Sequence, residues 1–145
     1  MSLSPEQIER QERVGHGTMG HAIGCRITEA SKKKVVVELP FRDDLRQVTG
    51  LFNAGAILTL ADTATTVLAN LNTQASIDEF DPARFPLSVQ LSANFVRNGN
   101  TGKIIAEATP VHLGRRMQVV QATVCDEKGR LFATVTNALM ISATG

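Results

Sequence analysis

The sequence of 145 residues has no tryptophan, no tyrosine and only six phenylalanines. The aromatic platforms that stack single-stranded bases are therefore missing. An excess of one charge is missing too, because 15 Lys and Arg side chains face 14 Asp and Glu side chains and leave a formal net charge of +1. Such a balance gives no general attraction to a phosphate backbone. We expect no nucleic-acid partner.

Cysteine is also scarce. Cys25 and Cys125 are too few and too far apart for a disulfide framework or a Cys-based zinc site, so they favour a reducing, cytoplasmic location and small core positions. We find no apolar stretch of membrane-spanning length and no apolar leader, and expect neither a membrane partner nor export. The spacing of His16 and His21 fits no ligand pair on a helix or strand, so no metal site is expected.

The length predicts one domain over residues 1–145. Its N-terminal part, residues 1–14, is expected to form a short helix, with the first three residues interpreted as a cloning remnant. Ser4, Pro5 and Gln7 have the pattern of an N-cap, a first-turn proline and a capping-box partner. A second, long and apolar helix is expected from near Asn53 to Gln74, followed by a polar loop.

Strands are predicted by β-branched residues, alternation and turn signals at residues 21–29, 33–40, 88–95, 103–111, 116–125 and 130–141. In the third of these, Val89, Leu91, Ala93 and Phe95 alternate with polar residues, which predicts one core face and one polar face. The predicted fold class is α+β, with a long central helix wrapped by a curved antiparallel sheet of about six strands. The edges of such a sheet favour a symmetric dimer.

Asp62 is the only charged side chain between Arg46 and Asp78, and it lies in the middle of the apolar helix. An uncompensated carboxylate is costly to bury there. One interpretation is a structural aspartate satisfied by Thr66 one turn later, by an arginine across an interface, or by water. The other is a catalytic base or nucleophile.

The start of the same helix supports the catalytic interpretation. Asn53, Ala54 and Gly55 are expected to present unpaired backbone N–H groups at the positive end of the helix, where an oxyanion is stabilised. Nine positions separate Asn53 from Asp62, so the two point to opposite sides and lie roughly 13 Å apart along the axis. If they cooperate, they must come from two subunits of a dimer.

The segments Arg46-Gln47-Val48-Thr49-Gly50-Leu51-Phe52-Asn53-Ala54-Gly55 and Leu60-Ala61-Asp62 together resemble the hotdog-fold acyl-CoA thioesterases. The phenylacetyl-CoA and hydroxybenzoyl-CoA thioesterase-like branches are the most similar. The resemblance extends from about residue 15 to residue 143. It includes the strand from Pro86 to Phe95 and the turn at His112-Leu113-Gly114-Arg115-Arg116.

The resemblance implies that Asp62 is the helix-borne acid, that the Ala54 N–H is the oxyanion donor and that Gln47 positions the thioester. Thr66 and Ser88 match hydroxyls near the attacking water in some relatives. Two residues depart from the usual His-Gly-Gly motif. Asn53 replaces the histidine, keeping a donor without the ring, and Ala54 replaces the first glycine, which requires a negative φ.

Arg115 and Arg116 match a place where relatives contact the phosphates of coenzyme A, and guanidinium groups suit phosphate oxygens. A solvated basic turn is the alternative. Arg97 and His112 are further candidates for the same pocket. No cofactor is expected, since coenzyme A is part of the substrate.

The resemblance implies hydrolysis of an acyl-CoA thioester by a homodimer at minimum, with a homotetramer also expected. A catalytically weak acyl-CoA-binding protein or a structural oligomer is the alternative. A hotdog dehydratase ranks last, because its histidine is expected just before the helix and the chain has only His16, His21 and His112. Serine-hydrolase and P-loop motifs are absent from the sequence.

Overall fold

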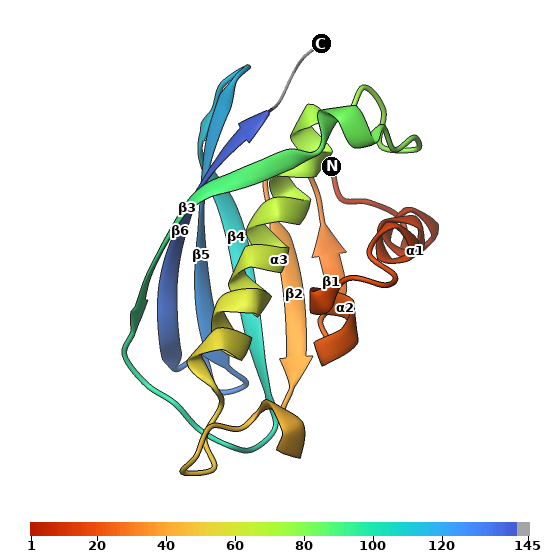
Figure 1. The fold of residues 1–145 in the computed structure, drawn as a ribbon. Helices are drawn as coiled ribbons and strands as arrows, with labels where there is room; N and C mark the ends of the chain where they lie inside the picture. The colour runs from red at the N-terminus through yellow and green to blue at the C-terminus, as the bar shows by residue number, and fades with distance from the viewer. Residues whose placement is uncertain (142–145) are drawn as a thin grey trace.

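The computed structural model describes residues 1–141 (Figure 1). Its helices, short 3-10 turns (η) and strands are, in chain order, α1 (Pro5–Val14), α2 (Met19–Ile23), β1 (Arg26–Ala30), β2 (Val35–Pro40), η1 (Asp43–Leu45), α3 (Ala54–Thr73), η2 (Pro82–Arg84), β3 (Pro86–Phe95), β4 (Lys103–Leu113), β5 (Met117–Asp126) and β6 (Leu131–Ile141).

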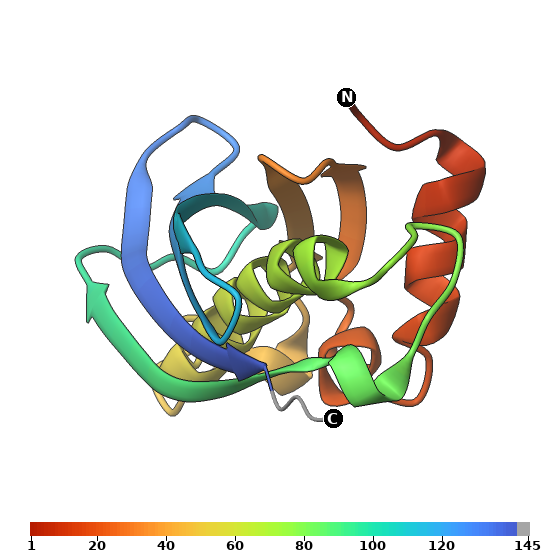
Figure 2. The same ribbon diagram turned by 90° about the horizontal axis from the view of Figure 1, so that it is seen from above.

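The six strands form one sheet in the order β1-β2-β4-β5-β6-β3, and each neighbouring pair is antiparallel. Seen from above, the sheet curves around α3, while α1 lies beyond the β1 edge of the sheet (Figure 2). The predicted α+β class, with a long helix wrapped by an antiparallel sheet, is confirmed.

Helix α3 begins and ends where the sequence predicts. Asn53 is its N-cap, and ten of its 20 residues are buried. Four of its residues, Ile57, Leu60, Leu68 and Leu71, are among the largest fully buried side chains, and they pack into one apolar cluster with side chains of the sheet. Since residues on most sides of α3 are apolar, the curved sheet covers a large part of its surface.

By length and composition, α3 could cross a membrane, so the expectation that the chain has no apolar stretch of that length is wrong. In the fold, 56% of the apolar 18-residue window of this helix is buried. Apolar residues on most sides of a helix are equally typical of the core of a large domain, and α3 takes that position here.

The N-terminal helix α1 has the predicted Ser4 capping box, with the Ser4 side chain accepting from the Gln7 N–H and the Gln7 side chain accepting from the Ser4 N–H. Leu3 also takes part in the fold, although it was interpreted as part of a cloning remnant. Its side chain is buried, and its N–H donates to the carbonyl oxygen of Ala30 at 2.7 Å.

The predicted strand at residues 21–29 is wrong in its first half, which belongs to α2. Thr18 caps this short helix by accepting from the His21 N–H, and Gly24 ends it with φ 108°, a left-handed conformation that glycine adopts without strain. Gly20 of α2 lies against Thr63 of α3, so close that a Cβ on Gly20 would stand 2.5 Å from the Thr63 hydroxyl oxygen. This close approach holds α2 to α3.

Strand β3 lies at the sheet edge and pairs only with β6 among the described strands. The predicted strand is confirmed, but the prediction that its alternating apolar residues form a buried face is wrong for one protomer. Val89, Leu91 and Phe95 remain exposed, at 53%, 37% and 45%. Val89 is the extra residue at a register shift between Ser88 and Gln90, so alternation does not place it. Leu91 and Phe95 do lie on the inner face, but a single helix does not extend far enough to cover that face at the edge.

Candidate active site

Asp62 accepts three hydrogen bonds from side chains that lie far apart in the sequence. The donors are the hydroxyls of Thr66 and Ser88 and the Nδ2 of Asn137, each 3.2 Å from the same oxygen, Oδ1. Thr66 is one turn further along α3, Ser88 is near the start of β3, and Asn137 is on β6. The other carboxylate oxygen, Oδ2, receives no hydrogen bond from residues 1–141. The half-buried acid is thus compensated at one oxygen and free at the other.

The bond between Thr66 and Asp62 matches the structural interpretation of this acid, and the bond from Ser88 brings together two residues that the family resemblance selected. Sequence reasoning missed Asn137, which is fully buried and also donates to the Thr65 hydroxyl at 2.9 Å. Its Oδ1 has no partner within the described residues. An unpaired buried polar atom of this kind costs about 1–3 kcal/mol.

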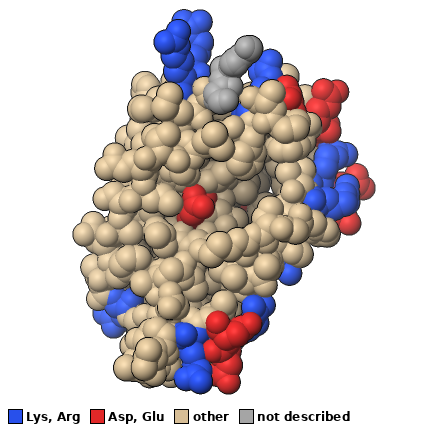
Figure 3. Space-filling model, viewed as in Figure 1, with Lys and Arg blue, Asp and Glu red and all other residues tan. Residues whose placement is uncertain are grey.

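A pocket of about 290 Å³ opens beside Asp62. Three parts of the chain line it: the end of α1 with the turn after it, the middle of α3, and residues 85–88 at the start of β3. Asp62 is the only charged residue in that lining. The surface in Figure 3 agrees, since its charged side chains gather at the ends and one edge, apart from an isolated acidic group beside a hollow near the middle. An acid with one free oxygen next to a neutral pocket is suited to act on an uncharged group.

The N-terminus of α3 offers fewer free donors than the sequence predicts. The Asn53 N–H donates to the Leu45 carbonyl oxygen at 2.8 Å, and the Gly55 N–H donates to Asn53 Oδ1 at 2.7 Å. Neither is unpaired, so that part of the expectation is wrong. The Ala54 N–H donates to no acceptor within residues 1–141. Ala54 also has a negative φ, since no non-glycine residue of the described chain has a positive one.

Gln47 lies in the loop before α3, not beside Asp62. Its Oε1 accepts from the backbone N–H and the hydroxyl of Thr49, the latter at 2.8 Å. Its backbone N–H donates to the Leu51 carbonyl oxygen at 2.7 Å. Gln47 therefore belongs to a tight loop next to the Ala54 end of the helix.

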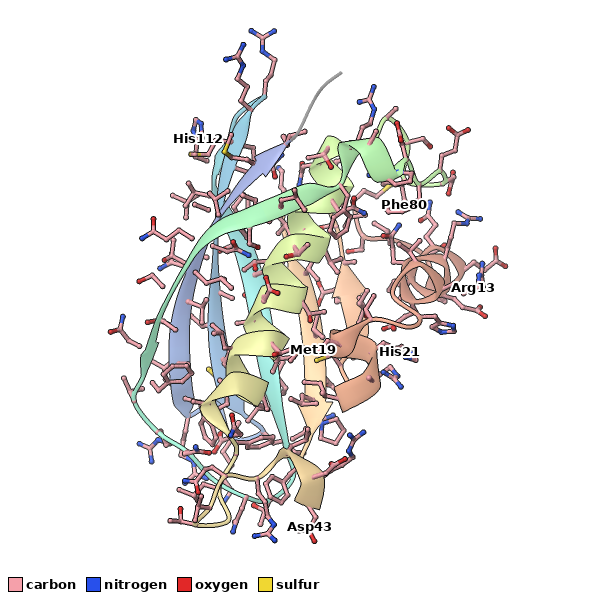
Figure 4. The ribbon with its side chains drawn as sticks, viewed as in Figure 1. Arg13, Met19, His21, Asp43, Phe80 and His112 are labelled. Carbon is pink, nitrogen blue, oxygen red and sulfur yellow. The ribbon has the colours of Figure 1, made fainter. Side chains whose placement is uncertain are left out.

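The candidate coenzyme A residues lie at two opposite ends of the protomer. Arg97 precedes Asn98, whose side chain accepts from the Phe52 N–H and donates to the Phe52 carbonyl, at the N-terminal end of α3. His112 lies near the far end of β4, at the other end of the molecule from Asp43 (Figure 4). Arg115 and Arg116 follow it in the β4–β5 turn. One protomer does not bring these residues together.

The cysteine and histidine candidates form neither a reactive thiolate nor a metal site among the described residues. Burial raises the pKa of the Cys25 thiol to about 11, despite a hydrogen bond with Thr63, so this buried group is not a thiolate near neutral pH. The His16 and His21 rings lie 4.4 Å apart between their centroids. Within residues 1–141, no group of three or more His, Cys, Asp or Glu side chains could hold a metal ion.

The sequence model of the thioesterase superfamily matches residues 49–133, which include α3 and most of the sheet. The chain belongs to the thioesterase superfamily. This superfamily member is 28% identical over 124 residues to the 1,4-dihydroxy-2-naphthoyl-CoA hydrolase of Escherichia coli, covering 86% of each chain. It is 30% identical over 117 residues to the proofreading thioesterase EntH of Klebsiella pneumoniae, covering 81% of this chain and 80% of that one.

Among solved structures, the superfamily member is similar to the thioesterase HI1161 of Haemophilus influenzae. The TM-score is 0.80 at 22% identity, and the match covers 92% of this chain and 88% of the other. The hotdog fold expected from the resemblance is confirmed. Together with the thioesterases among its relatives, the family makes this protein a thioester hydrolase.

Proposed function

We propose that the protein hydrolyses an acyl-CoA thioester to a free acid and coenzyme A, at a site shared between two subunits. The observation that carries the proposal is the Asp62 carboxylate, held by three donors at Oδ1 and free at Oδ2 beside a neutral pocket. A carboxylate in this arrangement can accept a proton from water or attack a carbonyl carbon.

In the proposed reaction, a water oxygen adds to the thioester carbonyl carbon while Oδ2 of Asp62 takes the proton. The Ala54 N–H at the positive end of α3 stabilises the oxyanion. Collapse of the tetrahedral intermediate breaks the C–S bond, and the departing thiolate receives the proton from Asp62. In the alternative route, Oδ2 attacks the carbonyl carbon and the C–S bond breaks to release the thiolate. Water then hydrolyses the resulting anhydride, which frees the acid and Asp62 and supplies the proton that the thiolate takes up. Both routes yield the same acid and thiol.

A second subunit is required because the oxyanion donors at the start of α3 and the Asp62 carboxylate lie on the same helix. Asn53 and Asp62 are nine residues apart, so they point to opposite sides and are separated by roughly 13 Å along the axis. Two-fold pairing through the β3 edge offers a solution. It would cover the exposed Leu91 and Phe95 side chains, and antiparallel strands would bring Ala54 of the partner subunit towards Asp62.

The same two-fold arrangement reverses the ends of the second protomer. Arg97 of one subunit and the pair Arg115 and Arg116 of the other then lie at the same end of the dimer, where their guanidinium groups can bind the phosphates of coenzyme A. His112 lies near the end of β4, just before the turn that carries the arginine pair. None of the three arginines forms an ion pair with a carboxylate within residues 1–141, so their charges are available for phosphate. Further pairing of dimers into a homotetramer, in the cytoplasm, is part of the proposal.

The pocket beside Asp62 is proposed to hold the acyl group. A volume of about 290 Å³, at about 30 Å³ for each water-sized unit, accommodates roughly ten non-hydrogen atoms. Val14, Val67 and Phe85 supply apolar contacts, and Asp62 is the only charge in the lining. We therefore expect an uncharged acyl group of medium size.

The second candidate function is binding of acyl-CoA without turnover. The observation that favours it is the hydrogen bond from the Gly55 N–H to Asn53 Oδ1, which occupies half of the side chain that replaces the usual histidine. Only the Ala54 N–H and the Asn53 Nδ2 then remain as donors at this terminus. If they polarise the carbonyl too weakly, the substrate binds and is not hydrolysed.

The deciding experiment measures thiol release from short, medium, long and aromatic acyl-CoAs by the wild type, Asp62→Asn and Asn53→Ala. Asp43→Asn is the matched control, because its carboxylate is almost fully exposed and is not part of the pocket lining. We expect Asp62→Asn to lower kcat at least about 100-fold and the control to leave it unchanged. Full turnover in Asp62→Asn would make Asp62 structural, and binding of acyl-CoA by an inactive wild type would favour the second candidate.

A further inference from the structure

Asn137 of β6 contacts Asp62 across 75 positions of sequence, and neither composition nor family resemblance singled it out. We infer that Asn137 is a positioning residue, which fixes the Asp62 carboxylate so that Oδ2 is the oxygen that reacts. This inference rests on the proposed function. It adds to it the identity of the working oxygen and of the group that selects it.

The position of Asn137 in its strand is unusual. The inward-facing residues of β6 include Ala133, Val135 and Leu139, which are apolar and at most 1% exposed. Asn137 continues the same alternation and is 0% exposed. An amide in the middle of an apolar row needs hydrogen-bond partners, because a polar group loses its hydration on burial.

The amide of Asn137 has only one sensible orientation. One N–H of its Nδ2 points to Asp62 Oδ1 at 3.2 Å and the other to the Thr65 hydroxyl at 2.9 Å. A flipped amide would place an oxygen against the Asp62 carboxylate oxygen, with no proton between them. The Thr65 hydroxyl is itself buried and donates to the Ala61 carbonyl oxygen at 2.9 Å, so the amide is fixed by the helix that carries the acid.

Asn137 differs in kind from the other two donors. Thr66 and Ser88 hold Asp62 through hydroxyls, whose protons rotate, and both residues line the open pocket. The Asn137 amide is planar and fully buried. Among the three donors it is therefore the one that solvent and substrate cannot displace.

The donor to Asp62 distinguishes Asn137 from Gln118, a second buried amide of the sheet whose side-chain oxygen is also unpaired. The Asn137 amide oxygen has no partner within residues 1–141, so the residue is only half satisfied. A leucine of similar shape would fill the same place without an unpaired atom. The donor to Asp62 is what such a replacement would lose. With three donors at Oδ1 and none from the described residues at Oδ2, the second oxygen keeps its lone pairs for the water or the carbonyl carbon.

The test compares Asn137→Leu and Asn137→Ala with the wild type, using the acyl-CoA that the wild type hydrolyses best. Both variants remove the amide donor without adding a charge, and Asn137→Ala avoids steric overlap if the leucine variant does not fold. Gln118→Leu is the matched control. Gln118 is also a buried amide of the sheet, 2% exposed, with an unpaired Oε1 and no hydrogen bond to Asp62.

We expect both Asn137 variants to lower kcat by about 10- to 100-fold while KM stays within about twofold, because a hydrogen bond to a charged group is lost at the reacting acid and not at the binding site. Gln118→Leu should keep the wild-type kcat. Circular dichroism and the thermal midpoint establish that each variant is folded.

Equal kcat in the Asn137 variants and in Gln118→Leu would overturn the inference, as would a rise in KM with kcat unchanged. A wild type that releases no thiol, or an Asp62→Asn variant that retains full turnover, would overturn the proposed function itself. The two failures are distinguishable, because only the first occurs with an active wild type that depends on Asp62.

Discussion

Asn53 uses the two ends of its side chain for different purposes, so substitution can separate its role in stability from its role in catalysis. Its Oδ1 accepts from the Gly55 N–H at 2.7 Å and caps α3. Its Nδ2 makes no hydrogen bond within residues 1–141 and is free to donate to a substrate carbonyl. Asn53→Ala removes both functions, whereas Asn53→Asp keeps the capping oxygen and removes the donor.

The expected stabilities follow from the cap. Loss of an N-cap side chain costs about 1 kcal/mol, within a range of about 0.5–2 kcal/mol. With a urea m-value of about 2 kcal/mol/M, the unfolding midpoint of Asn53→Ala should fall by about 0.5 M. Asn53→Asp places a negative charge at the positive end of α3, which contributes roughly 0.3–1 kcal/mol, so its midpoint should equal or exceed that of the wild type.

The expected activities do not follow the stabilities. Both variants lose the Nδ2 donor, so thiol release should show kcat reduced by about 100-fold in each, including the stable Asn53→Asp. Unfolding is followed at one fixed protein concentration, because association makes the midpoint depend on concentration. Full kcat in Asn53→Asp would refute the catalytic role of Nδ2, and an unchanged midpoint in Asn53→Ala would refute the cap.

Two further predictions concern packing and thiol chemistry. Gly20→Ala should lower the free energy of unfolding by about 1–3 kcal/mol, seen as a lower thermal midpoint, because the new Cβ would lie 2.5 Å from the Thr63 hydroxyl, which donates to the Thr59 carbonyl oxygen. Thr63→Ala in the same chain should restore most of the loss, and a fully stable Gly20→Ala would contradict the close contact between α2 and α3. Since burial raises the pKa of Cys25 to about 11, only roughly 0.1% of this residue is thiolate at pH 8. Iodoacetamide labelling followed by mass spectrometry should therefore modify the less buried Cys125 first and modify Cys25 faster as the pH approaches 11. Preferential labelling of Cys25 at pH 8 would contradict the raised pKa.

The long elements were predictable because their signals are local. Apolar residues on most sides of α3, with Asn53 before its first turn, predict a buried helix from sequence, and the structure has that helix. Helix α2 was not predicted, although Thr18 and Gly24 carry its N-cap and C-cap signals. Five residues are too few to form a stable helix alone, so α2 depends on the contact of Gly20 with α3, which local patterns do not describe.

The site was predictable to the extent that its residues are chemically conspicuous. Asp62 stands out as the one charge in an apolar helix, and Thr66 follows from helical geometry, since residues four apart are neighbours. Asn137 is different, because its contact with Asp62 depends on how β6 pairs and curves around α3. The signal that was available is a polar residue in the inward alternation of β6, between Val135 and Leu139.

Ser88 shows how one irregularity in a strand brings a hydroxyl to the acid. Strict alternation puts Val89 on the inner face of β3 and Ser88 on the outer face. The register shifts between Ser88, opposite Leu139, and Gln90, opposite Ala138, so Val89 is an extra residue in a β-bulge. Ser88 therefore shares the inner face with the buried Leu139 and donates to Asp62. Apolar periodicity locates the strand, but it does not encode the bulge, and the bulge decides which hydroxyl reaches the carboxylate.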